Sequence, residues 1–416
     1  MTRNHLSSWI DRFSHEGTLW FAKRLSGNDT LANGSHQAGP YVPREIIFQA
    51  FPALERKDLL NPDVHFDLLI DSHDKRGTIR AIWYNNKFIR EPKSGETGTR
   101  NETRLTNFGG RESPLLDPDN TGALAVFVFV LTGGSTRNCH VWVCRNEEEV
   151  EFLEGCMGPV EPKRPAVWRP GVGPSSAPAL SRRVGRSSCR LSPELIPAGW
   201  TKTFPSGEEL IQKTRELLRG DRLPMDARLL ARRECEYELF QSVEEAYYLP
   251  RIQLGFQSIE AFTTLAQTIL QSRKSRAGRS LEYHIRDIFI EEQLVQDVSF
   301  SHLPKRIDGG KKPDFIFPSE SAYLDNSFPS ERLRLLAVKT TCKDRWRQVL
   351  SEADRIQVKH LLTLQEGVSE NQFLEMSQAQ VKLVVPEALH PSYPKAVRPK
   401  LLKLEKFVAE VRQLAG

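Results

Sequence analysis

A chain of 416 residues with a formal net charge of +5 exceeds the size at which one hydrophobic core keeps growing, so more than one domain is expected. The mean hydropathy of −0.45, and the lack of any apolar run near eighteen residues in the sequence, argue against a membrane-spanning helix. The first residues lack the apolar core of a signal peptide, which predicts a cytoplasmic location, and the mild basic excess suits a nucleic-acid-binding protein without requiring one.

Residues 1–165 are rich in segments with the composition of β-strands. The apolar runs 81–84 and 123–131 favour strands, and glycine turns such as Gly133-Gly134 separate such runs. Few amphipathic helices are evident before Glu147. The pattern predicts an all-β, barrel-like domain.

From residue 166 to residue 200 the composition shifts to proline, glycine, serine and arginine. A segment of this kind has little apolar surface to bury, which predicts a flexible linker. A second domain is therefore expected over residues 201–416.

The six cysteines are expected to be reduced thiols, in keeping with a cytoplasmic protein. Cys139 and Cys144 flank a predicted strand, but no second Cys/His pair at zinc-binding spacing is evident in the sequence. Cys342 closely follows Lys339, and we expect it to pack at a strand end rather than to act as a nucleophile.

Helical patterns dominate from Glu208 up to the strands of the C-terminal part. A helix predicted over residues 228–243 places Arg233 and Tyr237 on one face, because they are four residues apart. Further helices are predicted where apolar residues recur at helical spacing. These are a stripe of Leu281, Ile285, Ile288 and Phe289, and the final segment 396–416.

Asp314, Lys339 and Glu352 have the spacing of a metal-dependent nuclease site. Asp314 precedes the apolar strand 315–317, Lys339 ends a second strand, and Glu352 is expected two turns into the following helix. Two carboxylates can hold a hard cation such as Mg²⁺, and a neighbouring lysine can polarise water or phosphate. The alternative is a chance spacing of common residues, with Glu352 a solvated helix acid.

Lys343, Asp344 and Arg345 lie between Lys339 and that helix. Together they offer hydrogen-bond donors and an acceptor suited to G·C base pairs. The alternative for Asp344 is to cap the helix predicted at 345–350.

The segments around these residues resemble the EcoRII family of restriction endonucleases. The likeness covers both ends of the chain and is weakest in the middle. It rests on the segments 23–26, 28–30, 36–37, 99–102, 117–124, 273–282, 312–315, 339–348 and 364–368.

This resemblance implies a multidomain protein, with an N-terminal all-β B3-like DNA-binding pseudobarrel and a C-terminal α/β PD-(D/E)xK domain that has a central mixed sheet flanked by helices. It implies a homodimeric Type IIE restriction endonuclease that cuts double-stranded DNA at 5′-CCWGG, before the first C, with Mg²⁺. A second copy of the site, bound at the N-terminal domain, would stimulate cleavage.

The resemblance also implies roles for individual residues. Asp314 and Glu352 would hold the metal, and Lys339 and Glu282 would complete the catalytic set. Lys343, Asp344 and Arg345 would contact the bases of the cleaved site. Arg233 and Tyr237 would stack on a base swung out of the duplex, with Arg232 as an alternative to Arg233 and a surface cation–π pair as the structural alternative. The effector DNA would be bound by Lys23, Arg24, His36, Tyr41, Arg100, Asn101, Glu102 and Arg104.

The sequence contains no phosphate-binding loop, no glycine-rich cofactor loop and no motif typical of DNA methyltransferases, so no nucleotide cofactor is expected. This favours a stand-alone restriction enzyme. Two other classes remain open. One is a repair or junction-resolving nuclease with the same acidic core, and the other is a non-enzymatic B3-like DNA-binding regulator.

Overall fold

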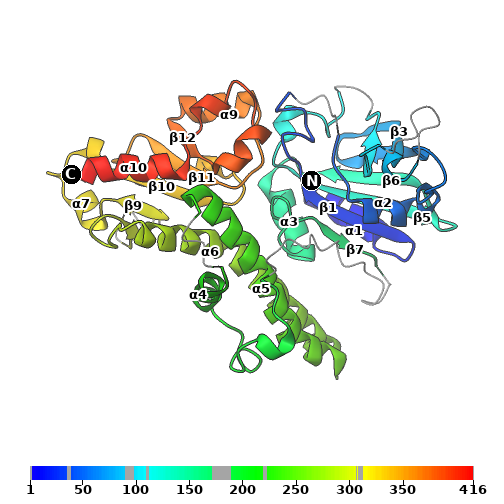
Figure 1. Ribbon diagram of the computed structural model, residues 1–416, viewed down its shortest axis with the longest axis horizontal. Coiled ribbons are helices and arrows are strands. Elements are labelled where there is room, and N and C mark those ends of the chain that lie inside the picture. Colours follow the sequence, from blue (N-terminus) through cyan, green and yellow to red (C-terminus); the bar gives the residue numbers. More distant parts are fainter. Residues whose placement is uncertain are drawn as a thin grey trace. The chain divides into compact units, whose positions relative to one another are not determined.

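The computed structural model describes residues 2–34, 39–89, 98–108, 112–170, 189–218, 223–305, 307 and 313–415. These residues form two compact units (Figure 1). The first contains the described residues up to position 170, with Gln365–Phe373 and Pro391–Pro399. The second contains the described residues of 189–364, with Leu374–His390 and those from Lys400 onward. Most of the predicted linker, residues 171–188, lies outside the described residues.

The N-terminal part of the first unit is built on a seven-stranded sheet, as far as the structure describes it, in the order β4-β3-β2-β6-β5-β1-β7. Strands β2 and β6 pair in parallel, and the other neighbouring pairs are antiparallel. The elements are α1 (Thr2–Phe13), β1 (Thr18–Arg24), α2 (Arg44–Ala50), β2 (Asp63–Ile70), β3 (Lys75–Tyr84), β4 (Glu102–Thr106), β5 (Leu124–Thr132), β6 (Ser135–Val143), α3 (Glu147–Met157) and β7 (Ala166–Trp168).

Strand β5 is apolar along most of its length because the sheet is covered on both faces. Phe127 and Phe129 belong to one hydrophobic cluster, and the alternate residues Val126 and Val128 belong to the other. Successive side chains of a strand point to opposite faces, so a strand buried on both sides must be a continuous apolar run. The strands predicted at 81–84 and 123–131 are confirmed.

Helix α1 corrects the expectation of few helices before Glu147. Its residues Leu6, Trp9 and Phe13 are buried in the cluster that contains Val126 and Val128. Their spacing of three and four residues is that of one helix face. Helix α2 likewise precedes Glu147, so the N-terminal part combines a sheet with helices rather than being all-β.

The second unit contains a mixed five-stranded sheet in the order β12-β11-β10-β9-β8. Strands β10, β11 and β12 pair in parallel, whereas β8, β9 and β10 pair antiparallel. The helices and strands of the C-terminal part are α4 (Gly207–Leu217), α5 (Met225–Gln253), α6 (Ile259–Glu291), β8 (Ser301–His302), β9 (Phe315–Phe317), α7 (Glu320–Leu324), β10 (Arg334–Lys339), α8 (Trp346–Val349), β11 (Lys359–Thr363), α9 (Glu370–Gln378), β12 (Val381–Val384) and α10 (Leu404–Ala415).

Two predicted amphipathic helices pack on this sheet. The stripe of α6 is buried as expected, with Leu281 and Ile285 at 1% and 0% exposure, and α6 contacts β10. Helix α10 buries Phe407, whose ring lies 5.4 Å from that of Phe317 on β9. Both helices therefore pack against strands of this sheet. No helix within the described ranges combines the length and hydropathy needed to cross a bilayer.

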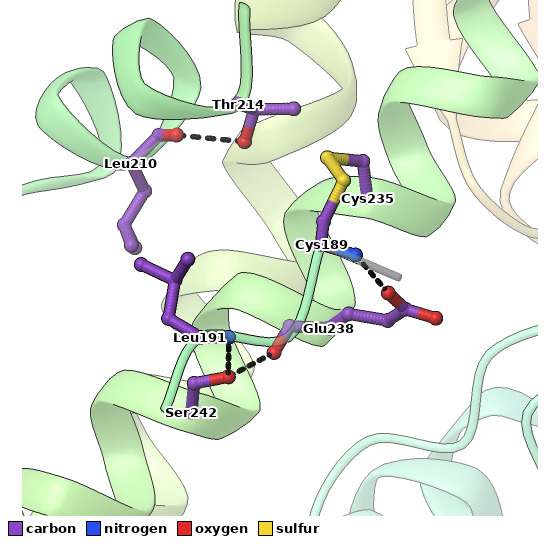
Figure 2. Close-up of a disulfide and its surroundings, with 7 residues drawn as sticks. All are labelled: Cys189, Leu191, Leu210, Thr214, Cys235, Glu238 and Ser242. Carbon is purple, nitrogen blue, oxygen red and sulfur yellow. Dashed lines mark hydrogen bonds between the residues drawn. A yellow bond between two sulfur atoms is a disulfide. The ribbon is translucent and has the colours of Figure 1, made fainter. Parts of the chain in front are cut away.

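The expectation of six reduced cysteines is wrong for one pair. Cys189 and Cys235 form a disulfide that ties the segment before α4 to α5 (Figure 2). The same segment is held by hydrogen bonds, because the backbone N–H of Cys189 donates to Glu238 at 2.6 Å and that of Leu191 to Ser242 at 3.0 Å. The two cysteines are 46 residues apart, and this disulfide could not be predicted because spacing alone does not specify disulfide connectivity.

Candidate active site

Asp314 and Lys339 lie side by side on two neighbouring strands of the second unit, as predicted. Asp314 precedes β9, Lys339 ends β10, and the two strands are antiparallel. The Nζ of Lys339 lies 3.2 Å from the Oδ2 of Asp314, which also accepts the backbone N–H of Val338 at 2.7 Å. Asp314 is 6% exposed, so these two donors fix the orientation of a buried carboxylate.

Glu352 does not lie in a helix, which corrects the prediction. Helix α8 ends at Val349, and the backbone N–H of Glu352 donates to the carbonyl oxygen of Val349 in the turn that follows. The next residue, Ala353, has a φ of 49°, in the left-handed region that a helix cannot continue through. The chain turns back here toward β11, which carries the Glu352 carboxylate toward the sheet.

The carboxylate of Glu352 is held in an unfavourable environment. Its Oε2 is buried and has no hydrogen-bond partner in the part of the chain that the structure describes. Burial raises the pKa of Glu352 to about 7; Asp314 raises this pKa too, whereas Lys339 and Lys359 lower it. Glu352 thus interacts electrostatically with Asp314 and Lys339, two of the other predicted catalytic residues.

This arrangement fits a divalent cation. A buried carboxylate oxygen without a donor is costly, and a cation beside it would supply the missing partner. Among the described residues, no group of three or more His, Cys, Asp or Glu side chains could hold a metal. The assignment of Asp314 and Glu352 as protein ligands, with water or phosphate oxygens at the other positions as is usual for Mg²⁺, remains a prediction.

Lys359 contributes to this site and was missed in the sequence. It is 5% exposed at the start of β11, and its Nζ donates to the backbone oxygens of Glu352 and, at 2.6 Å, of Ala353. A buried ammonium group thus closes the turn that presents Glu352. The sequence signal was a lysine at the head of the apolar run 359–363, which was not interpreted.

Glu282 lies on α6, close to the sheet. Its Oε2 is 3.9 Å from the Nε2 of His302 on β8, and its side chain is 14% exposed. Asp314 and Lys339 contact each other directly, whereas the described ion-pair partner of Glu282 is His302. A catalytic role for Glu282 remains a prediction.

Lys343, Asp344 and Arg345 form the connection between β10 and α8, and all three are half-buried. Helix α8 begins after Arg345, and its N-terminus has no side-chain cap hydrogen bond, so the alternative in which Asp344 caps this helix is wrong. Cys342 is fully buried, and burial raises the pKa of its thiol to about 12. The thiol is therefore a packed group rather than a nucleophile, as predicted.

Arg233 and Tyr237 both lie on α5, but a buried cluster that the sequence did not reveal engages Arg233. We call it the arginine cluster, and it consists of Arg233, Glu236, Arg276 and Ser280. The Oε2 of Glu236 accepts three hydrogen bonds, each of 3.1 Å. The donors are the Nη1 of Arg233, the Nη1 of Arg276 and the Oγ of Ser280. The guanidinium of Arg276 lies 5.1 Å from the ring centroid of Tyr237. Arg276, on the neighbouring helix, thus provides a cation over the ring of Tyr237.

Four of the residues predicted to bind effector DNA, Arg100, Asn101, Glu102 and Arg104, lie on or beside the edge strand β4. Arg104 donates to Glu102 at 2.9 Å, and Arg100 approaches Glu102 at 3.7 Å. The hydrogen bond from Arg104 is the largest cause of a lowered pKa at Glu102. The side-chain oxygen of Asn101 accepts from Arg44 and Trp83, at 2.9 and 3.0 Å.

The remaining predicted residues of this group are placed elsewhere in the first unit. Lys23 pairs with Asp29 at 2.7 Å, and Arg24 pairs with Glu154 at 2.6 Å with its side chain 9% exposed, as expected of a structural arginine. Tyr41 is exposed. His36 lies outside the described residues.

Comparison with known proteins bears on both parts of the chain. A family model described as restriction endonuclease EcoRII, N-terminal, matches residues 14–172, and one described as EcoRII C terminal matches residues 240–408. The chain is 40% identical to the Type II restriction enzyme EcoRII of Escherichia coli over 414 residues, which are 98% of this chain and 97% of that enzyme. The Type II restriction enzyme SsoII of Shigella sonnei is 28% identical over 125 residues, covering 29% of this chain and 40% of SsoII.

Solved structures give weaker likenesses. Metal-depleted Ecl18kI in complex with uncleaved DNA has 21% identity and a TM-score of 0.42, over 54% of this chain and 85% of that chain. The B3 domain of the UbaLAI restriction endonuclease with cognate DNA has 21% identity and a TM-score of 0.27, over 40% of this chain and 99% of that chain.

Proposed function

Because this chain belongs to the EcoRII family of Type II restriction enzymes, we propose that it cleaves double-stranded DNA at 5′-CCWGG, before the first C, with Mg²⁺ as cofactor. The observation that carries the catalytic part is the pairing of Asp314 with Lys339 beside Glu352, whose buried oxygen has no donor among the described residues. Charged groups are rarely buried in this way unless chemistry requires them.

The proposed architecture follows the family. Residues 201–416 form the catalytic domain of the PD-(D/E)xK type, and residues 1–165 form a B3-like effector DNA-binding domain. Residues 166–200 link the two. The mixed sheet that carries Asp314 and Lys339 on adjacent strands supports the first assignment.

The side chains have separable roles in hydrolysis. Mg²⁺, when bound, supplies a Lewis acid beside the scissile phosphate. The backbone N–H of Val338 and the Nζ of Lys339 both donate to Asp314, which would be the first metal ligand. The carboxylate of Glu352 would be the second ligand once it is deprotonated. The Nζ of Lys339, which lies 3.2 Å from Asp314, would donate to a phosphate oxygen or orient the attacking water.

Base recognition is assigned to the connection that follows β10. Lys343 and Arg345 would donate to guanine, and Asp344 would accept from the cytosine amino group in the major groove. These residues follow Lys339 within one short connection. Recognition and cleavage would therefore be coupled through a few residues of backbone.

Arg233 and Tyr237 are proposed to sandwich a base of the central pair. Stacking does not depend on the base edge, which suits a position where A and T are both accepted. Since Arg233 is bound to Glu236 and Ser280 in this structure, stacking requires the arginine cluster to open. A 2-aminopurine at the central position should brighten on binding to the wild-type protein; unchanged fluorescence would leave Arg233 and Tyr237 a structural pair.

A second copy of the site is proposed to regulate cleavage. In this proposal Lys343 and its neighbours would recognise the half-site, and the group around β4 would bind another duplex. The residues assigned to it are Arg100, Asn101, Glu102 and Arg104. Effector DNA would favour the cleavage-competent state by about 1–3 kcal/mol, the usual range of coupling between two sites.

Deleting residues 1–188, which leaves Cys189 and its disulfide with Cys235 in place, tests this regulation. The truncated protein should cleave a one-site plasmid readily, whereas the full chain should cleave it slowly and a two-site plasmid faster. Equal rates of the full chain on both plasmids would contradict an effector role for the N-terminal domain.

The proposed function is tested by digesting a plasmid of known sequence with the full chain and Mg²⁺ and sequencing the ends. Ends at 5′-CCWGG, formed with Mg²⁺ and suppressed by a chelator, are the expected result. Cuts at branched or damaged DNA would indicate a repair or junction-resolving nuclease. Binding without any cleavage would indicate a DNA-binding regulator.

A further inference from the structure

Lys359 is a buried lysine whose side chain binds the turn that carries Glu352. It is the first residue of β11, and its exposed fraction is 5%. Its Nζ donates to the backbone oxygen of Glu352 and, at 2.6 Å, to that of Ala353. An ammonium group is rarely buried this deeply unless its hydrogen bonds are satisfied, and here two successive backbone oxygens accept them.

The turn needs such a contact because it does not belong to a regular element. Helix α8 ends at Val349, and Ala353 has a φ of 49°, a backbone conformation that is unfavourable for a residue with a Cβ. Two backbone hydrogen bonds close the turn, from Glu352 to Val349 at 3.1 Å and from Ile356 to Ala353 at 2.9 Å. The two bonds from Lys359 add a connection between this turn and the sheet.

The backbone of Lys359 is fixed on both sides. Strand β11 lies between β10 and β12, and Lys359 pairs with Leu335 on one side and with Val381 on the other. Strand β10, which pairs in parallel with β11, ends at Lys339. Lys359 therefore attaches Glu352 to the same pair of strands that carries Lys339, so that the two predicted catalytic residues share one rigid support.

Lys359 and Lys339 differ in what they contact. The Nζ of Lys339 lies 3.2 Å from the carboxylate of Asp314, and its side chain is 20% exposed. The Nζ of Lys359 faces backbone oxygens inside the fold, at a position that DNA does not reach. Lys359 can therefore influence hydrolysis only through the residues that it holds, and Glu352 is one of them.

We propose that Lys359 is a positioning residue for DNA cleavage, which holds the carboxylate of Glu352 where a divalent cation can bind it together with Asp314. The proposal rests on the proposed function, in which Asp314 and Glu352 are the Mg²⁺ ligands. A ligand that is already in place loses less conformational freedom when the cation binds. Loss of Lys359 should therefore weaken metal binding although both carboxylates remain.

Five variants of the full-length protein test this role. Lys359→Met removes the ammonium group and keeps an unbranched side chain, and Lys359→Arg keeps the charge and the N–H donors. Lys359→Gln retains a neutral N–H donor and is the second variant if Lys359→Met does not fold. The matched control is Lys382→Met, because Lys382 is exposed on the neighbouring strand β12. Glu352→Gln removes the ligand itself, and circular dichroism establishes which variants are folded.

The first readout is the Kd for Mn²⁺ without DNA, measured from the electron paramagnetic resonance signal of the free ion. Lys359→Met and Lys359→Gln should bind Mn²⁺ about tenfold more weakly than the wild type, the loss usual when a partner of a metal ligand is removed. Lys382→Met should keep the wild-type Kd, and Lys359→Arg should keep most of the affinity. Adding Lys359→Met to Glu352→Gln should cause no further loss, because Lys359 acts through Glu352.

The second readout separates metal binding from the chemical step. In Lys359→Met, the Mg²⁺ concentration that gives half the maximal cleavage rate should rise by a similar factor, whereas the maximal rate and the Kd for the duplex should change little. A role in general stability would instead lower the maximal rate and leave the Mg²⁺ dependence unchanged.

A folded Lys359→Met protein with the wild-type Kd for Mn²⁺, or a further loss of affinity in the double variant, overturns the proposal. A wild type that binds no Mn²⁺ at millimolar concentration, or a Glu352→Gln protein that binds it as tightly as the wild type, would contradict the proposed metal site and this role with it. The expected Mn²⁺ results in a protein that does not cut 5′-CCWGG would support the role of Lys359 and contradict the proposed specificity alone.

Discussion

The charged residues assigned to DNA in the two units are held in opposite ways. In the first unit, Arg100, Glu102 and Arg104 are partly exposed at an edge strand and pair with one another. In the second unit, Glu352 is half-buried, and its Oε2 is a buried atom that has no donor in the described residues. Exposed pairs contribute little to stability and can exchange for phosphate or base contacts at low cost, whereas a buried unpartnered carboxylate destabilises the fold. The exposed pairs at β4 are therefore suited to binding, and the environment of Glu352 is suited to catalysis.

The largest effect should come from the second unit. Lys339→Ala is expected to reduce the single-turnover cleavage rate by at least about a thousandfold, because it removes the cation that lies between Asp314 and the developing phosphate charge. Affinity for the specific duplex, measured with Ca²⁺ in place of Mg²⁺, should change little. Arg104→Ala removes a cation from the first unit instead. Measured without effector DNA, the cleavage rate of this variant should stay within about threefold of the wild-type rate. Cleavage by the Lys339→Ala protein at the wild-type rate would refute the assignment.

The two units should also differ in their response to reduction. The disulfide between Cys189 and Cys235 lies in the second unit, whereas Cys139, Cys144 and Cys156 of the first unit are thiols outside any disulfide. Opening a loop of 46 residues should lower the unfolding free energy of the second unit by about 4 kcal/mol in the chain-entropy account. Denaturation followed by tryptophan fluorescence, with and without a thiol reductant, measures this effect. A Cys189→Ala, Cys235→Ala protein that is insensitive to reductant is the control, and equal shifts of both units would contradict the distinction.

A smaller effect is expected for base recognition. Arg345→Ala should lose about 1–3 kcal/mol of discrimination against a substituted guanine. Arg104→Ala should instead reduce stimulation by effector DNA and leave the preferred cleavage site unchanged. The ratio of kcat/KM on matched and mismatched duplexes distinguishes the two. If Arg104→Ala relaxed the cleavage specificity as much as Arg345→Ala, the division of labour between the units would be wrong.

The strands and much of the site could be predicted because their signals are local. The apolar runs around residues 128 and 337 and the Leu281 stripe mark elements by periodicity alone. The Asp314–Lys339 contact followed from placing two short strands next to each other, as the structure confirms.

What could not be predicted depends on tertiary contacts. Glu352 lies in a turn that Lys359 closes from the next strand, and no periodicity records such a contact. The pairing of Cys189 with Cys235 and the contacts of Arg276 and Ser280 with Glu236 likewise join segments that lie far apart in the sequence. Helix α1 is different, because it could have been predicted from the sequence. Its apolar residues at positions 6, 9 and 13 have the spacing of one helix face.

The central claim is that the buried Oε2 of Glu352 has no hydrogen-bond partner among the described residues, and the pH dependence of stability in Glu352→Gln tests it most directly. The pKa of Glu352 is raised from about 4.5 to about 7 in the folded protein. Between pH 4.5 and pH 7 the metal-free folded protein therefore binds a proton at Glu352 that the unfolded chain has already released. Stability from this group is present below pH 4.5 and lost as the pH rises through 7. The wild type should therefore lose about 2–3 kcal/mol relative to Glu352→Gln between pH 4.5 and pH 8, measured by chemical denaturation with a chelator present. Parallel pH profiles, or a Gln variant that is less stable at pH 8, would show that the carboxylate has a structural partner and contradict the account.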